Sequence, residues 1–265
     1  MKSFGEWAII TGATDGIGKA FAEELAKDGL NIMLISRNID KLRRVACELE
    51  ECYKVKTEID FYDKLEAAVN GLSSICCLIN NVGMSLTYPD SFASSPLTTA
   101  DKIKDIVLCN VLSASIMSRI VSSKLENQAS RAYIINISSY SGTIPVPLLA
   151  LYAGTKAFIW NFSRSLSLES SKVVVKTLAP GFVSTSMTHN RRTSILVPSA
   201  HQYACSALNT LGVEAHGAGY LPHALFAIVV NAVPSFIRSR LVYSQMHSLR
   251  AKTLKKMENT SKKTG

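Results

Sequence analysis

Near its start the chain reads Ala8-Ile9-Ile10-Thr11-Gly12-Ala13-Thr14-Asp15-Gly16-Ile17-Gly18. The first four residues predict a short buried strand, and residues 19–28 have helical periodicity. Strand, glycine turn and helix in this order favour a dinucleotide site, because glycine lets the backbone approach a pyrophosphate and a helix N-terminus offers it free N–H groups. The alternative is a tight structural turn without a ligand.

The rest of the chain repeats this alternation. Apolar strands are predicted near 7–11, 31–36, 55–60, 75–80, 132–138 and 173–179, with helices between them that include 101–124 and 149–170. Alternating strands and helices predict an α/β fold, a doubly wound parallel sheet, and 265 residues with 47% hydrophobic content suit a single domain. Ligands of such sheets bind at the carboxyl ends of the strands.

A proton-transfer set follows the fifth predicted strand. Tyr152 and Lys156 are four residues apart and share one helix face, and Ser139 lies thirteen residues before Tyr152. A phenol has a pKa near ~10, and a neighbouring cation is expected to lower it. Tyr152 then becomes a usable acid for a carbonyl oxygen or base for an alcohol, held by Ser139. The alternative is an ordinary helix, where Tyr and Lys at this spacing are common.

The residues after the second strand indicate which cofactor binds. An NAD enzyme is expected to have an acidic residue about 20 positions after the glycines. This chain has Arg37 there, with Lys41 one turn later. A guanidinium suits a 2′-phosphate, so the sequence predicts NADP(H). The alternative is that Arg37 is a solvated loop cation.

These motifs together resemble those of the short-chain dehydrogenase/reductase family, over residues 5 to about 237. The matching residues, in order, are Thr11-Gly12, Gly16-Ile17-Gly18, Asn80-Asn81-Val82-Gly83, Asn110, Ser139, Tyr152, Lys156 and Pro180-Gly181. Residues 5–8, 15–19, 34–37, 80–85 and 145–149 are similar to one branch, and residues 219–225 are similar to its type 12 members in particular. It contains the 17β-hydroxysteroid dehydrogenases of types 3 and 12 and the very-long-chain 3-oxoacyl-CoA reductases.

The resemblance implies a Rossmann-type fold and a role for each matching position. Asn110, Ser139, Tyr152 and Lys156 would form the catalytic set, with Asn110 holding a water in a proton relay. The implied cofactor-binding residues are Gly12, Thr14, Asp15, Gly16, Ile17, Gly18, Arg37, Lys41, Asp60, Asn81, Tyr152, Lys156, Pro180, Gly181, Val183 and Thr185. Of these, Asp60 would contact adenine and Thr185 the carboxamide. Substrate would meet Ser139, Tyr152, Arg191 and Arg192, the arginines on a lid after Thr185. Tyr140 stands where relatives often have glycine, and its ring is expected to narrow the pocket.

The carboxyl-terminal part has a different composition. Residues 238–265 hold eight Lys or Arg and one acidic residue, a net +7 of the chain's +9. We therefore divide the chain into a cofactor-binding domain with its lid, 1–237, and a basic tail, 238–265. Residues 220–237 are apolar but interrupted by Pro222 and Pro234, so we expect an interfacial or capping helix rather than a membrane span. The alternative is a plain core helix with a solvated tail.

The same part bears on partners and location. No aromatic platform or reading motif accompanies the basic residues, so nucleic acid is not an expected partner. The chain ends Lys262-Lys263-Thr264-Gly265, which resembles the dilysine signal of endoplasmic-reticulum membrane proteins. We expect the cytosolic face of that membrane, with a cytoplasmic protein as the alternative. The six cysteines have no metal-like spacing and suggest a reducing environment.

The predicted function is NADPH-dependent reduction of a lipid ketone, either a 3-oxoacyl-CoA in fatty-acid elongation or a 17-ketosteroid. The arginines of the lid favour the acyl-CoA, because they suit phosphate groups. Two alternatives remain: a catalytically silent protein of the same fold, and a membrane-surface interaction protein. The resemblance also makes a homodimer or homotetramer plausible, through helices 101–124 and 149–170.

Overall fold

The computed structural model describes residues 2–60, 64–213 and 215–264, with side chains up to residue 259. In this described part, seven parallel strands form one sheet in the order β3-β2-β1-β4-β5-β6-β7. The strands are β1 (Trp7–Thr11), β2 (Asn31–Ile35), β3 (Thr57–Asp60), β4 (Ile75–Asn80), β5 (Ala132–Ile137), β6 (Val173–Leu178) and β7 (His216–Gly217). The predicted doubly wound parallel sheet is confirmed. The two-residue strand β7 was not predicted, because it is too short to have a pattern.

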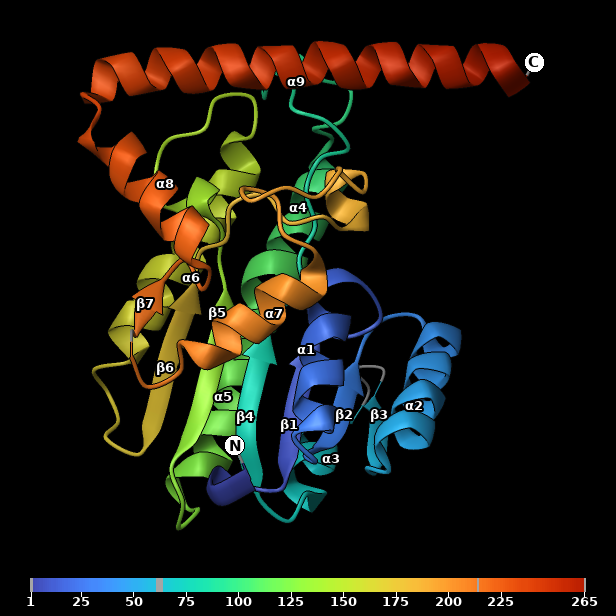
Figure 1. Ribbon diagram of the computed structural model, residues 1–265, viewed down its shortest axis with the longest axis vertical. Helices are drawn as coiled ribbons and strands as arrows, with labels where there is room; N and C mark the ends of the chain where they lie inside the picture. Colours follow the sequence, from blue (N-terminus) through green and yellow to red (C-terminus); the bar gives the residue numbers. More distant parts are fainter. Residues whose placement is uncertain (1, 61–63, 214, 265) are drawn as a thin grey trace.

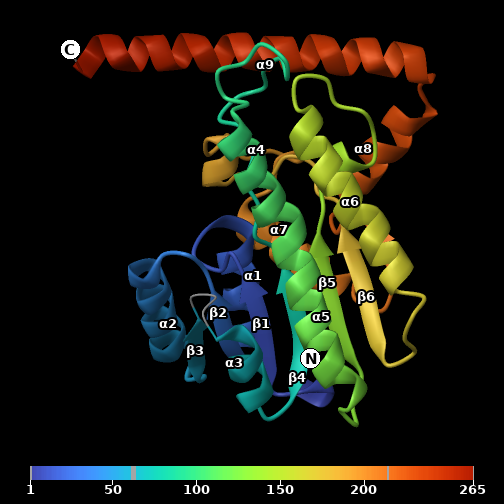
Figure 2. The same ribbon diagram turned by 180° about the vertical axis from the view of Figure 1, so that it is seen from behind.

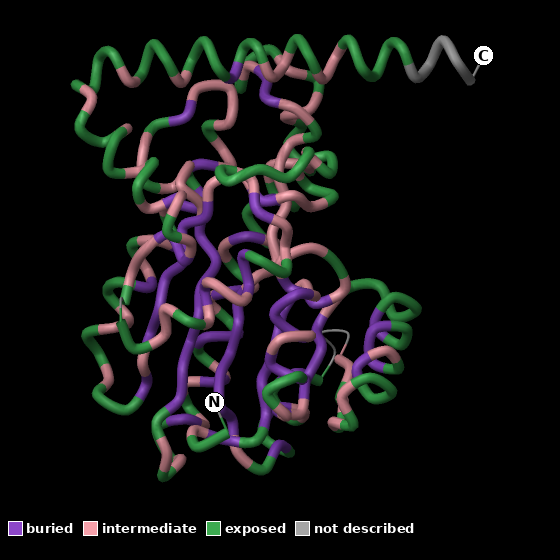
Figure 3. Tube along the Cα trace, in the orientation of Figure 1, coloured by how far each residue is buried: buried purple, intermediate pink, exposed green. Residues whose placement is uncertain are grey.

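Helices cover both faces of the sheet (Figures 1 and 2). One face carries α1 (Gly16–Lys27), α2 (Ile39–Tyr53) and α7 (Ala200–Asn209); the other carries α3 (Leu65–Gly71), α5 (Ser113–Glu126) and α6 (Ala150–Leu166). Strand β1 shows why both faces need a cover of helices. Ala8 and Ile10 pack with the first layer and Ile9 with the second, because successive side chains of a strand point to opposite faces. Figure 3 shows this buried centre in purple.

Strand order reverses beside β1, which pairs with both β2 and β4. In an open α/β sheet, this switch point at the carboxyl ends of the strands is where ligands bind. The glycine turn follows β1, Asn81 follows β4, and Ser139 and Pro180 follow β5 and β6. The sheet therefore places four predicted site segments along one edge.

The predicted helix 101–124 extends from 100 to 126 and is not uniform. It consists of α4 (Ala100–Val107), a π-helical turn labelled η2 (Leu108–Leu112), and α5. By length and composition alone, Ala100–Glu126 is able to cross a membrane, with a mean hydropathy of 1.5 in its most apolar window. Its α5 part packs on the sheet through Met117, Val121 and Leu125. Packing inside the fold therefore accounts for part of its apolar character.

Two helices form the carboxyl-terminal part. Helix α8 (Leu221–Ala232) and helix α9 (Ser235–Thr264) are separated at Pro234. Helix α9 lies across the end of the molecule toward which the strands point, above the loops that reach up from the sheet (Figures 1 and 2). The residues predicted as a basic tail are thus helical throughout their described length. Their outer face is exposed, which agrees with the green tube of α9 in Figure 3.

Candidate active site

The glycine turn is folded too tightly for side chains at its key positions. Gly12 has φ +65° and Gly16 has φ +55°, a region that glycine adopts without strain. A Cβ on Gly18 would overlap the carbonyl oxygen of Gly12 and the side-chain amide of Asn81. The turn therefore leaves its backbone bare, as a close approach to a pyrophosphate requires.

Asn81 braces this turn from the neighbouring strand. Its Nδ2 donates to the carbonyl oxygens of Thr11 and Gly12, both at 3.2 Å, and its amide donates to Thr11 Oγ1 at 3.0 Å. The sequence predicted Asn81 beside the cofactor. The structure shows in addition that its side-chain donors hold the ends of β1 and β4 together.

The segment after β6 closes against the same turn. Asp15 caps α1, accepting from the Gly16 amide at 2.7 Å, and its other oxygen accepts from Ser186 Oγ. A Cβ on Gly16 would lie 3.1 Å from the Thr185 methyl group. Thr185 and the buried Val183 are thus brought to the turn from some 170 positions along the chain.

The residues predicted for the adenosine end gather after β2 and β3. Ser36 Oγ lies 3.2 Å from Thr14 Oγ1, which places Arg37 next to the glycine turn. Arg37 and Lys41 are both exposed, and Asp60 pairs with Ile35 at the end of β3. The structure thus places exposed Arg37 beside the glycine turn.

Asn110 lies in the π-helical turn, a feature often found at functional sites. Its Nδ2 donates to the carbonyl oxygen of Met84 and to Thr155 Oγ1, both at 2.9 Å, and its Oδ1 accepts from the Met84 amide at 2.7 Å. The side chain is buried and joins the π turn, the segment after β4 and helix α6. The predicted water relay is not tested by these contacts.

Tyr152 and Lys156 project from the first two turns of α6, and Ser139 lies at the end of β5. Lys156 Nζ lies 5.9 Å from the centroid of the Tyr152 ring and donates to the carbonyl oxygen of Ile137 at 2.9 Å. A Cβ on Gly83 would be 3.2 Å from the same Nζ, a tight contact, so a larger residue there would press on the end of the lysine side chain. The ends of β4 and β5 therefore meet at the ionisable pair of Tyr152 and Lys156.

The electrostatics of the pair differ from the sequence prediction. Burial raises the pKa of Tyr152, and a hydrogen bond with Ser139 opposes it only in part. Burial also lowers the pKa of Lys156 to about 8, and a coulombic interaction with Cys109 opposes this only in part. The predicted lowering of the tyrosine pKa is therefore not seen, because burial of the phenol outweighs the hydrogen bond with Ser139. At neutral pH Tyr152 remains protonated.

One residue of this region was not predicted to bear on the site. His223, at the start of α8, is 4% exposed and lies under the loop after β6. Its Nδ1 accepts from the Gly181 amide, and its Nε2 lies 3.2 Å from the carbonyl oxygen of Leu196, so Nε2 carries the proton. Burial lowers its pKa, with hydrogen bonds to Leu196 and Phe182 opposing. The sequence analysis assigned no role to this histidine, which it placed in an apolar segment that resembles the type 12 members.

The lid arginines belong to the segment after β6, and Tyr140 packs against α8. The guanidinium carbon of Arg191 lies 3.9 Å from the centroid of the Phe182 ring, and Arg192 is exposed. Tyr140 faces α8: its ring meets Phe226 edge-on at 6.0 Å, and its hydroxyl lies 3.4 Å from Asn231 Oδ1. The ring is thus partly engaged by α8, a contact that the sequence did not indicate.

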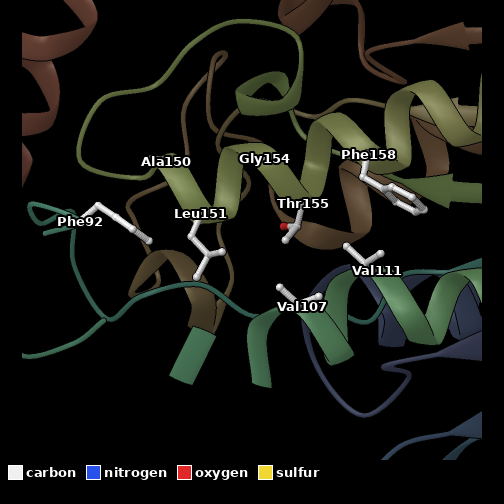
Figure 4. Close-up of a pocket in the computed structure, with 8 residues that line it drawn as sticks. All are labelled: Phe92, Val107, Val111, Ala150, Leu151, Gly154, Thr155 and Phe158. Carbon is white, nitrogen blue, oxygen red and sulfur yellow. The ribbon is translucent and has the colours of Figure 1, made fainter. Parts of the chain in front are cut away.

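A separate apolar cavity of about 410 Å³ lies on the far side of α6, against α4 and the π turn (Figure 4). Leu151, Gly154 and Phe158 line it together with Val107, while Tyr152 and Lys156 are not among its lining residues. It is therefore distinct from the proton-transfer set.

Comparison with known proteins agrees with this geometry. The model of the short chain dehydrogenase family matches residues 6–195. A very-long-chain 3-oxoacyl-CoA reductase of Bos taurus is 42% identical over 264 residues, which cover 96% of this chain and 84% of that protein. A short-chain dehydrogenase of Sphingobium yanoikuyae in complex with NADPH has a TM-score of 0.69 at 25% identity, covering 77% of this chain and 83% of that one.

A 7β-hydroxysteroid dehydrogenase superimposes with a TM-score of 0.78 at 23% identity, over 90% of this chain and 97% of that chain, and shows the fold alone. The family match covers most of the chain, including the glycine turn and the Ser139–Lys156 segment. The chain therefore belongs to the short-chain dehydrogenase/reductase family, and it is related to the very-long-chain 3-oxoacyl-CoA reductases.

Proposed function

We propose that the protein is an NADPH-dependent reductase of a lipid ketone, with a 3-oxoacyl-CoA as substrate. One observation carries the reaction type: Ser139, Tyr152 and Lys156 meet at the carboxyl edge of the sheet, beside a glycine turn whose backbone is bare. The name of the related Bos taurus enzyme supports the substrate class.

The glycine turn and the start of α1 have the properties that a dinucleotide site needs. The turn is too tight for side chains at Gly12 and Gly18, so its backbone is accessible. The N-terminus of α1 follows, and the N–H groups of a helix N-terminus suit a pyrophosphate. Arg37 would meet the 2′-phosphate of NADPH, which is why we propose NADP(H) rather than NAD(H). When bound, the cofactor would supply the hydride.

The protein's own residues would then manage the proton. Ser139 Oγ and the Tyr152 hydroxyl would hold the carbonyl oxygen of the substrate. Tyr152 would donate its proton to that oxygen, and its raised pKa keeps the proton available at neutral pH. Lys156, held by Ile137, and Asn110, held by Met84 and Thr155, would position the groups around it.

A substrate panel with NADPH tests the reaction and the substrate class together. We expect turnover of 3-oxoacyl-CoA thioesters that exceeds turnover of 17-ketosteroids. Steroid turnover alone would replace the substrate assignment. Binding of NADPH with no turnover of any ketone would favour a silent relative, and it would contradict the proposal.

The lid arginines provide a second test of the substrate class. We propose that Arg191 and Arg192 recognise the phosphates of coenzyme A. Replacing both with alanine should raise KM for a 3-oxoacyl-CoA several-fold and leave ketosteroid activity almost unchanged, because a steroid has no anionic group. Arg191 also stacks on Phe182, so the pair Arg191→Lys and Arg192→Lys is the control that keeps the charges. Equal losses on both substrates would indicate a damaged lid.

We further propose that α8 and the start of α9 contact an anionic membrane surface. Exposed apolar residues gather there: Leu221, Leu225, Phe226, Ile228, Val229, Phe236, Ile237 and Leu241. Residues 215–257 contain six Lys or Arg and no acidic residue, although one of the six, Arg250, pairs with Asp90. Apolar side chains beside an excess of positive charge suit anionic lipid.

Vesicle sedimentation tests this contact. Ile228→Ser with Val229→Ser should weaken binding to vesicles that contain phosphatidylserine, whereas Val213→Ser, 85% exposed but outside the surface, should not. If neither variant loses binding, the proposed membrane contact is wrong.

The endoplasmic reticulum remains the proposed location. Lys262→Ser with Lys263→Ser should disperse the protein if the dilysine sequence retains it. These side chains lie outside those that the structure describes.

A homodimer or homotetramer is also proposed, through the outer faces of α4, α5 and α6. Val107, Leu108, Leu112, Ile116 and Phe158 are 38–45% exposed there, next to the apolar cavity. Sedimentation of Ile116→Asp against the unchanged protein tests it. The same mass for both proteins, equal to one chain, would contradict this proposal.

A further inference from the structure

Asp90 is a buried carboxylate at the junction of three segments. It lies between β4 and α4 and is 6% exposed. One oxygen, Oδ1, accepts from the Ser91 amide at 2.9 Å and from Arg250 Nε at 2.8 Å, and Oδ2 accepts from Ser95 Oγ at 2.8 Å. A charge this buried needs such partners, and Arg250 is the cationic one among them.

Burial by itself disfavours the charged form of Asp90. The hydrogen bonds from Ser95, from the Ser91 amide and from Arg250, together with the positive charge of Arg250, outweigh this effect, and the pKa of the Asp90 carboxyl lies below its ordinary value. The ion pair is therefore formed at neutral pH, across 160 positions of sequence.

The backbone of Asp90 reaches the start of α6. Its amide donates to the carbonyl oxygen of Leu148 at 2.9 Å. Leu148 has φ +65°, a left-handed conformation that a leucine adopts only when its surroundings hold it there. Leu149 is the N-cap of α6, and Tyr152 is the third residue of that helix. Asp90 thus fixes the backbone immediately before the candidate catalytic tyrosine.

Helix α9 packs on the same place. Met246, one turn before Arg250 on the same face, is 5% exposed and lies in a cluster with Val146 and Ala153, the latter adjacent to Tyr152. Leu149, the N-cap of α6, is packed against this cluster. In Figure 1, α9 crosses above the loops that lead into α4 and α6. One helix face therefore contacts the first turn of α6 and the segment before it through both an apolar and a charged side chain.

We propose that Arg250 is a positioning residue for the reaction: its pairing with Asp90 holds α9 on the catalytic end and keeps the first turn of α6, and with it Tyr152, in place. This inference rests on the proposed reductase function. Arg250 acts through Asp90 and Leu148 and contacts neither cofactor nor substrate. Its loss leaves the glycine turn untouched, since no member of this set belongs to that turn.

Steady-state kinetics of variants made in the whole 265-residue chain tests the proposal. Arg250→Gln should lower kcat by about 10- to 100-fold, the scale expected when a reacting group is displaced by an ångström or less. The Kd for NADPH should stay within about twofold, because neither the glycine turn nor Arg37 is among the contacts of the Asp90–Arg250 pair. Arg250→Lys keeps a charge that reaches Asp90 and should recover part of the loss. Arg240→Gln, an exposed arginine on the same helix, is the matched control and should behave like the unchanged protein.

A second measurement does not depend on turnover. Hydrogen exchange of the first amides of α6, including the Ala153 N–H that bonds Leu149, should speed up in Arg250→Gln and in Asp90→Asn but not in Arg240→Gln. A lower melting temperature with unchanged kcat and unchanged exchange in α6 would overturn the proposal. If no ketone is reduced by the unchanged protein, the proposed function fails, and the exchange result alone decides whether the Asp90–Arg250 pair holds α6.

Discussion

The glycine turn and helix α9 lie at the same end of the sheet, but different kinds of contact hold them. The turn is fixed by backbone atoms so close that Gly18 admits no Cβ. Helix α9 is held largely by one face of side chains, around Met246 and Arg250, and much of the rest of its surface is exposed. In a site built from backbone, almost every substitution is expected to be disruptive. In a helix held by one face, most substitutions are expected to be tolerated, and only those at the few contacting residues should be disruptive.

This difference predicts that the largest effect belongs to the chemistry at the sheet edge. Tyr152→Phe removes the proton donor and keeps the ring, so we expect kcat to fall by about 10²–10⁴-fold, the usual contribution of general acid catalysis. Fluorescence titration should show nearly unchanged NADPH binding. Substantial turnover by the purified variant would rule out Tyr152 as the acid.

Helix α9 provides a matched pair of apolar residues. Met246 is 5% exposed and Leu241 is 60% exposed on this helix. Met246→Ala should lower the free energy of unfolding by about 2–3 kcal/mol through lost burial and a cavity. Leu241→Ala should change it by less than about 0.5 kcal/mol. Equal values in denaturant titration would show that α9 does not dock by the face described.

The buried lysine of the sheet edge predicts a pH effect. Burial lowers the pKa of Lys156 to about 8 from 10.5, so the unfolded chain binds more protons between these values and stability rises with pH. From pH 8 to pH 10 the gain is about 2 kcal/mol. Lys156→Met should lack this gain, and the difference between the two proteins cancels groups that titrate in both. Parallel stability curves would mean that Lys156 is not desolvated.

Two glycines test the claim about backbone contact. Gly18→Ala should destabilise the protein by about 1–3 kcal/mol, because the new methyl group overlaps Gly12 and Asn81. A Cβ on Gly154, in α6, meets nothing within 4 Å, so Gly154→Ala should be neutral or stabilise by up to about 1 kcal/mol. Thermal unfolding of both variants decides, and a stable Gly18→Ala protein would show that the turn has room.

The last prediction concerns cofactor choice. Arg37→Asp should weaken NADPH binding relative to NADH by about tenfold or more, since a charge-assisted contact is worth about 1.5–3 kcal/mol. Dissociation constants for both cofactors provide the ratio. If the ratio does not move, Arg37 is a surface cation with no part in recognition.

Local sequence rules were sufficient for the sheet edge of the site and not for the helices that pack above it. The glycines after β1, the serine after β5 and the Tyr152–Lys156 spacing each follow from neighbours within a few residues, and the structure brings these segments together. The Asp90–Arg250 pair, the histidine under Gly181 and the contact of Tyr140 with α8 each join residues far apart in sequence, for which one sequence contains no pattern. Lys156 was expected to lower the pKa of Tyr152, but burial, which spacing cannot show, raises that pKa.

The π-helical turn at residues 108–112 has a consequence for how this chain tolerates length changes. A π turn contains one residue more than an α-helical turn, so it rotates the downstream helix by about 100° relative to an unbroken helix. Within the turn Asn110 faces Thr155, and beyond it Met117, Val121 and Leu125 face the sheet. If one residue between Asn110 and Met117 were deleted, either Asn110 would no longer face Thr155 or Met117 would no longer face the sheet. The number of residues between these two positions is therefore as strictly fixed as the residues themselves.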